Sequence, residues 1–306
     1  MKVKDLIDRY IDEMGTDQHP GIDPLGLSHL YCLRRLKKYA IVEKRAAALT
    51  KHDIIDHVKV RRAEGVCGAT ALHDITFLRG VLKYAPSGWK DCDDVSDACI
   101  SAALPMLTKH GLVGKSTPRT RRPTDEELHK LIEYLGEQDK HCKIKVVPCL
   151  MFALVSTRRR GEICRLQWGD VDFEKRSYMI RDMKHPTKKK GNHKTFTLFD
   201  DLALIIKSQP RITASPEERV FPYNAQSLGA RYTLAKKALG IVNLRFHDNR
   251  GEAISRYLQM GLKPHEVRLI SGHENTILLE RVYDRRDSAY LYDKLAEMKP
   301  ANQVAA

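Results

Sequence analysis

No stretch of the sequence is apolar for long enough to cross a lipid bilayer, and the N-terminus, MKVKDLIDRYIDEM, carries charges where a secretory signal would be apolar. A membrane-spanning helix needs about 20 consecutive, mostly apolar residues, and a signal peptide contains an uncharged apolar segment. We therefore expect a cytoplasmic protein that has no membrane partner.

Paired cysteines are also missing. The seven cysteines are odd in number, and none belongs to a CxxC pair. Zinc sites and disulfide frameworks use cysteines at paired, regular spacing, so we expect reduced thiols. The sequence has no convincing carboxylate cluster for a metal either, because the acidic run of Asp91, Asp93 and Asp94 is typical of a solvated turn. We expect neither a metal ion nor another cofactor.

Acidic residues are too few to balance the basic ones. The 306-residue chain has 53 Lys and Arg against 39 Asp and Glu, which gives a net charge of +14. Residues 1–118 contribute +3 of this charge and the remaining residues contribute +11. A polyanion is the natural partner of such a chain. This distribution favours a nucleic acid that is bound most strongly by the C-terminal part.

The length is sufficient for two domains joined by a linker. Residues 113–124 form the predicted linker, since KHGLVGKSTPRTRRPT at 109–124 contains two Gly, two Pro and five basic residues and has no apolar period. Residues 1–112 predict a helical bundle. Their apolar residues recur at helical spacing within the segments 3–11, 27–40, 54–63, 71–84 and 95–107.

The second domain, residues 125–288, is predicted to be mainly helical with a small antiparallel sheet. Thr124 and Glu127 match a capping box that opens a helix through Leu135. Two segments rich in strand formers, 177–184 and 195–198, flank a polar turn. Further helices are predicted at 145–155, 162–168, 200–208, 226–239, 247–259 and 264–270.

Several short motifs follow one another in this second domain. The segment STRRRGEICRLQW places three arginines after an apolar helix, with Arg159 three residues before Glu162. His247 and Arg250 form a His-x-x-Arg pattern at the start of a predicted helix, and Gly-His ends at His273. A tyrosine comes ten residues after His273. Each motif alone is weak evidence, but their ordered combination is specific.

The ordered set resembles the tyrosine recombinase (phage integrase) family over about residues 120–290. The resemblance implies a helical core-binding domain that contacts DNA at 1–112 and a mixed α/β catalytic domain at 125–288. It also implies a layout like that of Xer or shufflon recombinases, which lack an arm-binding domain. The expected activity is site-specific recombination, in which a homotetramer cleaves and rejoins double-stranded DNA at two sites without metal or ATP.

The resemblance assigns a role to each motif. Arg159 and Arg250 would hold the non-bridging oxygens of the scissile phosphate, a task that suits the permanently charged guanidinium fork. Tyr283 would attack the phosphorus and form a 3′-phosphotyrosine. His247 would assist proton transfer from the tyrosine, and His273 would hydrogen-bond a phosphate oxygen. Tyr290 and Tyr292 stay open as alternative nucleophiles.

Two supporting roles complete the predicted site. Glu162 would orient one of the arginines or a backbone amide. A lysine in the turn between the strands would donate a proton to the leaving 5′-oxygen, which requires a lowered pKa. Lys184 matches this position best, while the other lysines of the turn, Lys188, Lys189, Lys190 and Lys194, remain alternatives.

Further contacts with the DNA backbone are predicted for basic residues of the linker, the arginine triplet and the strand turn. Arg158 and Arg160 would point away from the scissile phosphate, toward flanking phosphates or acidic neighbours. The whole predicted set is Lys115, Arg119, Arg121, Arg122, Arg158, Arg160, Lys188, Lys189 and Lys190.

Some alternatives remain open at this stage. The tail, residues 289–306, would either cap its own domain or dock on a neighbouring protomer. A type IB topoisomerase shares the predicted chemistry but acts alone, and a DNA-binding regulator could keep the fold without catalysis. Accessory DNA-bending or directionality proteins are further partners that the resemblance allows.

Overall fold

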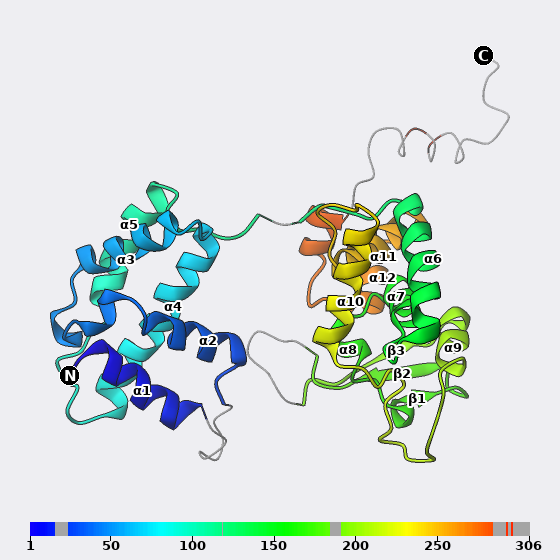
Figure 1. Ribbon diagram of the computed structural model, residues 1–306, viewed down its shortest axis with the longest axis horizontal. Coiled ribbons are helices and arrows are strands. Elements are labelled where there is room, and N and C mark those ends of the chain that lie inside the picture. The colour runs from blue at the N-terminus through cyan, green and yellow to red at the C-terminus, as the bar shows by residue number, and fades with distance from the viewer. Residues whose placement is uncertain (16–23, 118, 184–190, 284–291, 293–294, 296–306) are drawn as a thin grey trace. The chain divides into compact units, whose positions relative to one another are not determined.

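A computed structural model divides the chain into two compact units, Met1–Thr117 and Pro118–Ala306, and Figure 1 shows the elements of each. The boundary between the units falls inside the predicted linker. The residues that the structure describes are 1–15, 24–117, 119–183, 191–283, 292 and 295. Apart from its two described positions, the predicted protomer-docking tail at 289–306 lies outside these residues.

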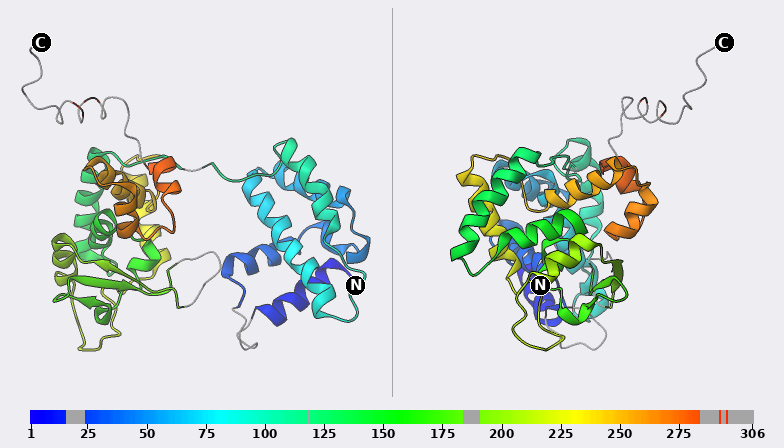
Figure 2. Two further views of the ribbon diagram at one scale, coloured as in Figure 1. Left: turned by 180° about the vertical axis from the view of Figure 1, so that it is seen from behind. Right: turned by 90° about the vertical axis from the view of Figure 1, so that its right-hand side faces the viewer.

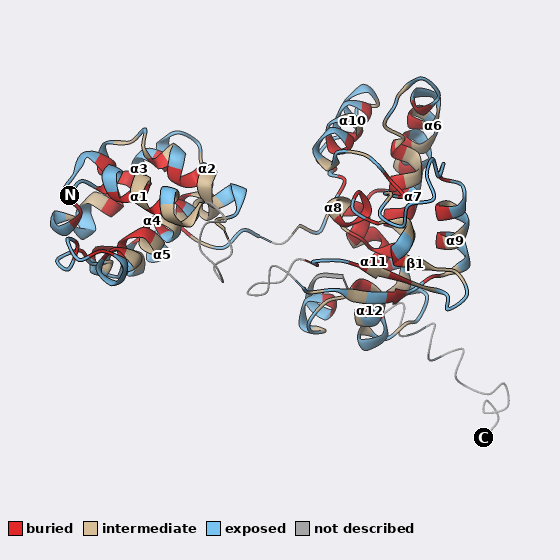
Figure 3. Ribbon diagram, turned by 90° about the horizontal axis from the view of Figure 1, so that it is seen from below, coloured by how far each residue is buried: buried red, intermediate tan, exposed pale blue. Residues whose placement is uncertain are grey.

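Unit 1 is helical throughout its described part, as predicted. Apolar residues at i, i+3, i+4 and i+7 give α1 a buried face made by Val3, Leu6, Ile7 and Tyr10. The helices turn such faces toward a common core (Figure 3). The elements are α1 (Val3–Met14), α2 (Leu27–Leu36), η1 (Ala40–Glu43), η2 (Ala46–Ala48), α3 (Lys51–Ala63), α4 (Gly68–Gly88) and α5 (Ala98–Lys109).

Among the described residues of unit 1, Asp74 on α4 is the acidic residue that is buried in the core. Arg61 Nε donates a hydrogen bond to Asp74 Oδ2 at 2.7 Å, and Arg35 pairs with Oδ1. His57 Nε2 lies 3.7 Å from Oδ2. Burial alone would raise the pKa of Asp74, but the adjacent His57 and the hydrogen bond from Arg61 outweigh it and hold this pKa far below its usual range. The carboxylate therefore stays charged and forms ion pairs with both arginines.

Unit 2 combines helices with the small antiparallel sheet that the sequence predicts. Its helices are α6 (Asp125–His141), α7 (Val146–Ser156), α8 (Arg160–Ile163), η3 (Trp168–Asp170), α9 (Asp200–Lys207), α10 (Ala225–Ala238), α11 (Asp248–Gln259), α12 (Pro264–Ser271) and η4 (Leu279–Tyr283). Thr124 and Glu127 form the predicted capping box at the start of α6. No helix in the described parts of the chain is long and apolar enough to cross a membrane.

The sheet of unit 2 has the strand order β1-β2-β3, and both pairings are antiparallel. Its strands are β1 (Val171–Asp172), β2 (Ser177–Ile180) and β3 (Lys194–Thr197). The sheet lies at one end of the unit in Figures 1 and 2. Two expectations are corrected here. The sequence did not predict β1, because a strand of two residues is too short to show an alternating pattern. The helix predicted at 162–168 is shorter and begins earlier, as α8 (Arg160–Ile163).

The most apolar helix, α7, lies at the centre of unit 2. It contacts α6, α8, α9, α10 and α11, and its buried residues join the core that the sheet also contributes to. The helix ends at Thr157, which adopts a left-handed conformation with φ of 60°. Such a conformation is unusual for a β-branched residue. It turns the chain sharply, so that the arginine triplet follows directly from the core.

Candidate active site

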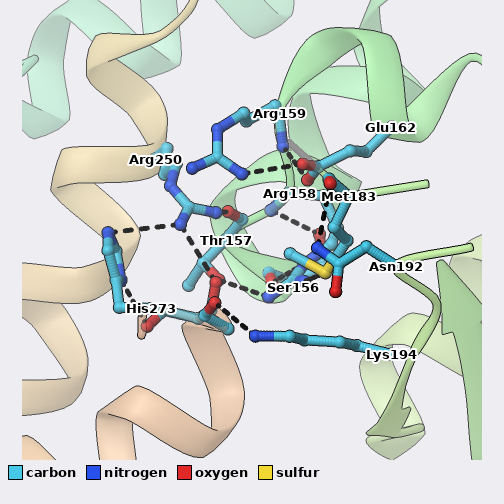
Figure 4. Close-up of polar contacts among 12 residues, drawn as sticks. Ser156, Thr157, Arg158, Arg159, Glu162, Met183, Asn192, Lys194, Arg250 and His273 are labelled. Atoms are coloured by element: carbon cyan, nitrogen blue, oxygen red, sulfur yellow. Dashed lines mark hydrogen bonds and ion pairs between the residues drawn. The ribbon is translucent and has the colours of Figure 1, made fainter. Parts of the chain in front are cut away.

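The three consecutive arginines separate into different environments. Arg158 is buried, and its Nε donates a hydrogen bond to Ser156 O at 2.9 Å. Its Nη2 bonds Thr157 Oγ1 at 3.1 Å and also Ile270 O, and its guanidinium lies 3.8 Å from the ring centroid of Phe196. The prediction that Arg158 points toward flanking phosphates or acidic residues is therefore wrong. Its donors are directed to oxygens inside the unit (Figure 4).

Arg159 is the partly exposed member of the triplet and is held by Glu162. Nη1 of Arg159 donates to Glu162 Oε1 at 2.8 Å, and the Arg159 amide donates to Oε2 at 2.9 Å. Burial raises the pKa of Glu162, but the charge of Arg159 and the amide bond outweigh it, so the carboxyl stays ionised. Because 30% of the Arg159 side chain is exposed, donors on its far side remain accessible to an external anion.

Arg250 reaches the same region from α11. It is buried, Nη1 bonds Thr157 O, and Nη2 donates to Ser271 O at 3.0 Å. The turn at Thr157 and the end of α12 thus fix this guanidinium through two neutral carbonyls. Sequence reasoning missed Thr157 and Ser271, since any residue type can supply a backbone carbonyl and no side-chain pattern marks it.

Two histidines lie beside these guanidiniums. His273 Nε2 is 3.4 Å from Arg250 Nη2, and His273 Nδ1 is 2.7 Å from Ser271 Oγ. Burial, followed by the charges of Arg250 and Arg159, lowers the pKa of His273 to about 3. This ring is therefore neutral at physiological pH and can donate or accept a hydrogen bond without changing the net charge of the site.

His247 precedes the first residue of α11. The residue is exposed overall, but the protein around one side of the ring, followed by the charges of Arg250 and Arg159, lowers its pKa. Its ring is thus biased toward the neutral form, in which one ring nitrogen can accept a proton. The charges of the same two arginines lower the pKa of both histidines, so both rings favour the neutral form.

The strand hairpin packs beneath the loop that carries His273. Gly272 ends α12 with φ of +72°, and a Cβ on this residue would lie 2.9 Å from Met183 Cε and 3.0 Å from Phe196 Cζ. Lys194 Nζ bonds Glu274 Oε1 at 2.5 Å and Gly272 O at 3.5 Å. Met183, the last described residue before the turn, therefore lies next to the loop that carries His273. The predicted acid and its neighbours, Lys184, Lys188, Lys189 and Lys190, lie outside the described residues.

Tyr283 is the last residue of η4, and its side chain lies outside the described part of the structure. The backbone of η4 packs against α11 and α12. Leu279 of η4 is buried against Ile254, Leu258 and Val267 in a small apolar cluster. The segment that ends at Tyr283 is therefore anchored to the two helices that lead to Arg250 and His273.

The linker arginines are engaged within unit 2. Arg119 pairs with Asp248 at 2.7 Å, and Arg122 pairs with Glu252 at 2.6 Å, so both fasten the linker to α11. Arg121 pairs with Glu127 of α6. A share of each side chain, between 22% and 30%, stays exposed. DNA contacts by these residues and by the exposed Lys115 of unit 1 stay predictions.

Comparison with known proteins identifies relatives of this chain. The model of the phage integrase family matches residues 121–289, which include every predicted catalytic side chain. The chain is 26% identical over 300 residues to a Haemophilus influenzae protein named as an integrase/recombinase, covering 95% of this chain and 89% of that protein. It is 27% identical over 281 residues to the shufflon-specific DNA recombinase of Escherichia coli, covering 89% and 67% of the two chains.

Solved structures show the same fold at lower identity. The Tn1549 transposon integrase in complex with a circular intermediate DNA superposes with a TM-score of 0.69 and 14% identity, covering 98% of this chain and 100% of that one. A lambda integrase bound to DNA superposes with a TM-score of 0.59 and 14% identity, covering 94% and 98% of the two chains.

Proposed function

The chain belongs to the phage integrase family and is a DNA strand transferase, and we infer that it performs site-specific recombination through a covalent link between DNA and Tyr283. The observation that carries this proposal is the way the site holds its arginines. Two neutral carbonyls orient the Arg250 guanidinium, and the side that Arg159 presents outward is accessible. Carbonyls fix the Arg250 guanidinium without cancelling its charge, and Glu162 offsets only the charge of Arg159, so the location attracts an anion with paired oxygens.

A DNA phosphodiester fits this location. Its two non-bridging oxygens can receive forked N–H donors from Arg159 and Arg250, and these donors stabilise the charge that grows on the oxygens as the phosphorus becomes five-coordinate. The neutral His273 ring can add a hydrogen bond to one oxygen. The arginines supply positive charge without a metal ion, so we expect cleavage to proceed in the presence of a chelator.

The proposed transfer step replaces one bond to phosphorus with another. The Tyr283 oxygen forms a bond to phosphorus, the bond from phosphorus to the 5′-oxygen breaks, and the products are a 3′-phosphotyrosine and a free 5′-hydroxyl. The neutral His247 ring assists removal of the phenol proton, and Lys184 supplies a proton to the 5′-oxygen. Lys184 follows Met183, which packs against Gly272 of the His273 loop, and Lys194, which contacts the same loop, is the alternative acid. A 5′-hydroxyl from a second site reverses the step and exchanges strands.

Recombination between two duplexes requires four cleavages, and we propose a homotetramer bound to two DNA sites. A type IB topoisomerase would relax supercoils without joining two sites. A catalytically silent regulator would bind DNA without forming an adduct. Detection of recombinant joints between two copies of the site separates the proposed function from both.

A nicked suicide substrate tests the proposal. The DNA that flanks the gene supplies candidate sites, and a nick near the cleaved bond lets a short fragment diffuse away, so the covalent complex accumulates. We expect the wild-type protein to form this complex with EDTA present and the Tyr283→Phe variant to form none while still binding DNA. Tyr292→Phe is the matched control and should behave like the wild type. Adduct formation by Tyr283→Phe would contradict the proposal.

A further inference from the structure

A cavity of about 500 Å³ opens beside the predicted catalytic arginine, between α8, α10 and the start of α11. We propose that this cavity binds a second backbone phosphate of the DNA, on the strand that is cleaved and next to the phosphate held by Arg159 and Arg250. The inference rests on the proposed function and extends it. It assigns DNA binding to Lys236 and Arg245, which no motif indicated, and it gives Arg160 a specific location.

The lining of the cavity is strongly basic. Its charged and titratable residues are Arg159, Arg160, Lys236, Arg245 and His247, and no Asp or Glu is among the described residues that line it. A volume of this size lies within the usual range for ligand-binding clefts. A cavity with several cations and no carboxylate favours an anionic occupant.

The cations of the cavity differ from other basic residues of the same unit. Arg119, Arg121 and Arg122 each pair with a carboxylate. The side chains of Arg160, Lys236 and Arg245 have no ion pair anywhere in the described parts of the chain, although Arg160 and Lys236 are only partly exposed. Holding unpaired cations close together is unfavourable, and a bound phosphate removes this cost.

A glycine on α10 makes room for one of these cations. Gly229 is buried, and a Cβ at this position would lie 2.6 Å from Arg160 Cζ and closer still to Nη1. A glycine inside a helix is normally unfavourable relative to alanine. At this position the missing side chain lets the Arg160 guanidinium lie against the helix, where it faces the cavity with Lys236.

The position of the cavity indicates which phosphate it receives. Arg159 and His247 line it and also belong to the proposed catalytic site. Two anion-binding locations that share residues suit consecutive phosphates of one strand. Binding the neighbour would fix the direction of the strand across the site and hold the scissile phosphate in register for attack.

Lys236→Gln tests the inference, with Lys237→Gln as its matched control. Both residues lie on α10, but Lys237 is exposed and does not line the cavity. The probe is a 20-base-pair duplex of arbitrary sequence, with affinity measured by anisotropy at several salt concentrations. Loss of one phosphate contact reduces the salt slope by about 0.9, so the loss of affinity between about 50 and about 200 mM salt becomes about 3.5-fold smaller. We expect this change for Lys236→Gln and not for Lys237→Gln.

Gly229→Ala provides a second test that does not depend on removing a charge. The added methyl group displaces the end of the flexible Arg160 side chain, while alanine favours the helix. We expect the thermal midpoint of unfolding to stay unchanged or rise, and the affinity for DNA to fall as it does in Arg160→Gln. The double variant should lose no more affinity than Arg160→Gln alone.

The outcomes separate this inference from the proposed function. An unchanged salt slope in Lys236→Gln, or an equal change in Lys237→Gln, overturns the cavity assignment even if the wild type forms its covalent adduct. Wild-type affinity in Gly229→Ala overturns it as well. If the slope changes as expected while no adduct forms on any substrate, the cavity assignment stands and the recombinase proposal fails.

Discussion

Both units of the molecule hold arginines in their interior, but they differ in how the charge is balanced. In unit 1 the buried carboxylate of Asp74 pairs with Arg35 and Arg61. In unit 2, backbone carbonyls receive the donors of Arg158 and Arg250. Carbonyl oxygens satisfy N–H groups without cancelling charge. The comparison teaches that a carboxylate acceptor, as at Asp74, indicates a structural cluster, whereas carbonyl acceptors leave the charge available but do not alone make an anion-binding site, since Arg158 uses its donors inside the unit.

The cluster of unit 1 should therefore affect stability, and Asp74→Asn should have the largest effect. Removing the carboxylate takes the buried counter-charge from the buried Arg61, which keeps only the exposed Glu64, and from the partly exposed Arg35, which costs about 3–5 kcal/mol. The chain has two tryptophans, one in each unit, Trp89 and Trp168. In a Trp168→Phe background, fluorescence during urea unfolding reports on unit 1. Asp94→Asn, an exposed control, should unfold like the parent. If Asp74→Asn is as stable as the parent, the Asp74 cluster has no structural role.

In unit 2, changing the buried Arg250 should affect the rate of covalent-adduct formation. Arg250→Lys keeps a charge but loses the forked geometry, and we expect covalent-adduct formation on the nicked substrate to slow about 10²–10³-fold. The matched variant Arg61→Lys alters the cluster of unit 1. At a temperature where both variants are folded, its rate of adduct formation should stay near that of the wild type. Equal slowing of both variants would show that the two clusters do not differ in role.

The stability of unit 2 should decrease as the pH falls, because of His273. The pKa of His273 falls to about 3 in the folded protein, against about 6.5 when unfolded. Between these values the unfolded chain binds the extra proton, so the free energy of unfolding of unit 2 decreases as the pH drops below about 6.5. We expect a loss of about 1–2 kcal/mol from this residue between about pH 7 and pH 5.

This loss can be measured with Trp168 as the reporter in a Trp89→Phe background. His273→Gln should remove that part of the pH slope, since glutamine does not titrate. A slope that is identical with and without His273 would mean that the ring is not held neutral by its surroundings.

The smallest effect is expected in the linker. Arg119→Gln removes the partner of the buried Asp248, which keeps a hydrogen bond from the Arg245 amide at 2.8 Å. Because the Arg119 side chain is partly exposed, we expect a cost of only about 1 kcal/mol to the unfolding free energy of unit 2. Lys115→Gln, at an exposed linker position, serves as the control and should change stability by less than the error of the urea midpoint.

Local sequence signals predicted much of this fold. The capping box at Thr124 and the apolar spacing of α1 depend on residues within one or two turns, so they can be read directly. The environment of Arg158 could not be predicted, because its acceptor on Ile270 and the ring of Phe196 are distant in sequence. The motif order predicted roles for Arg159 and Arg250 that stay predictions, whereas the basic cavity arises only when α8, α10 and the start of α11 pack together.

The central claim is that charge on the arginines, rather than their shape alone, activates the scissile phosphate. A methylphosphonate at the cleaved position removes the negative charge and tests this claim directly. We predict that Arg250→Gln slows adduct formation about 10²-fold or more on the phosphate substrate, but only a few-fold on the methylphosphonate. Equal slowing of Arg250→Gln on both substrates would contradict the account.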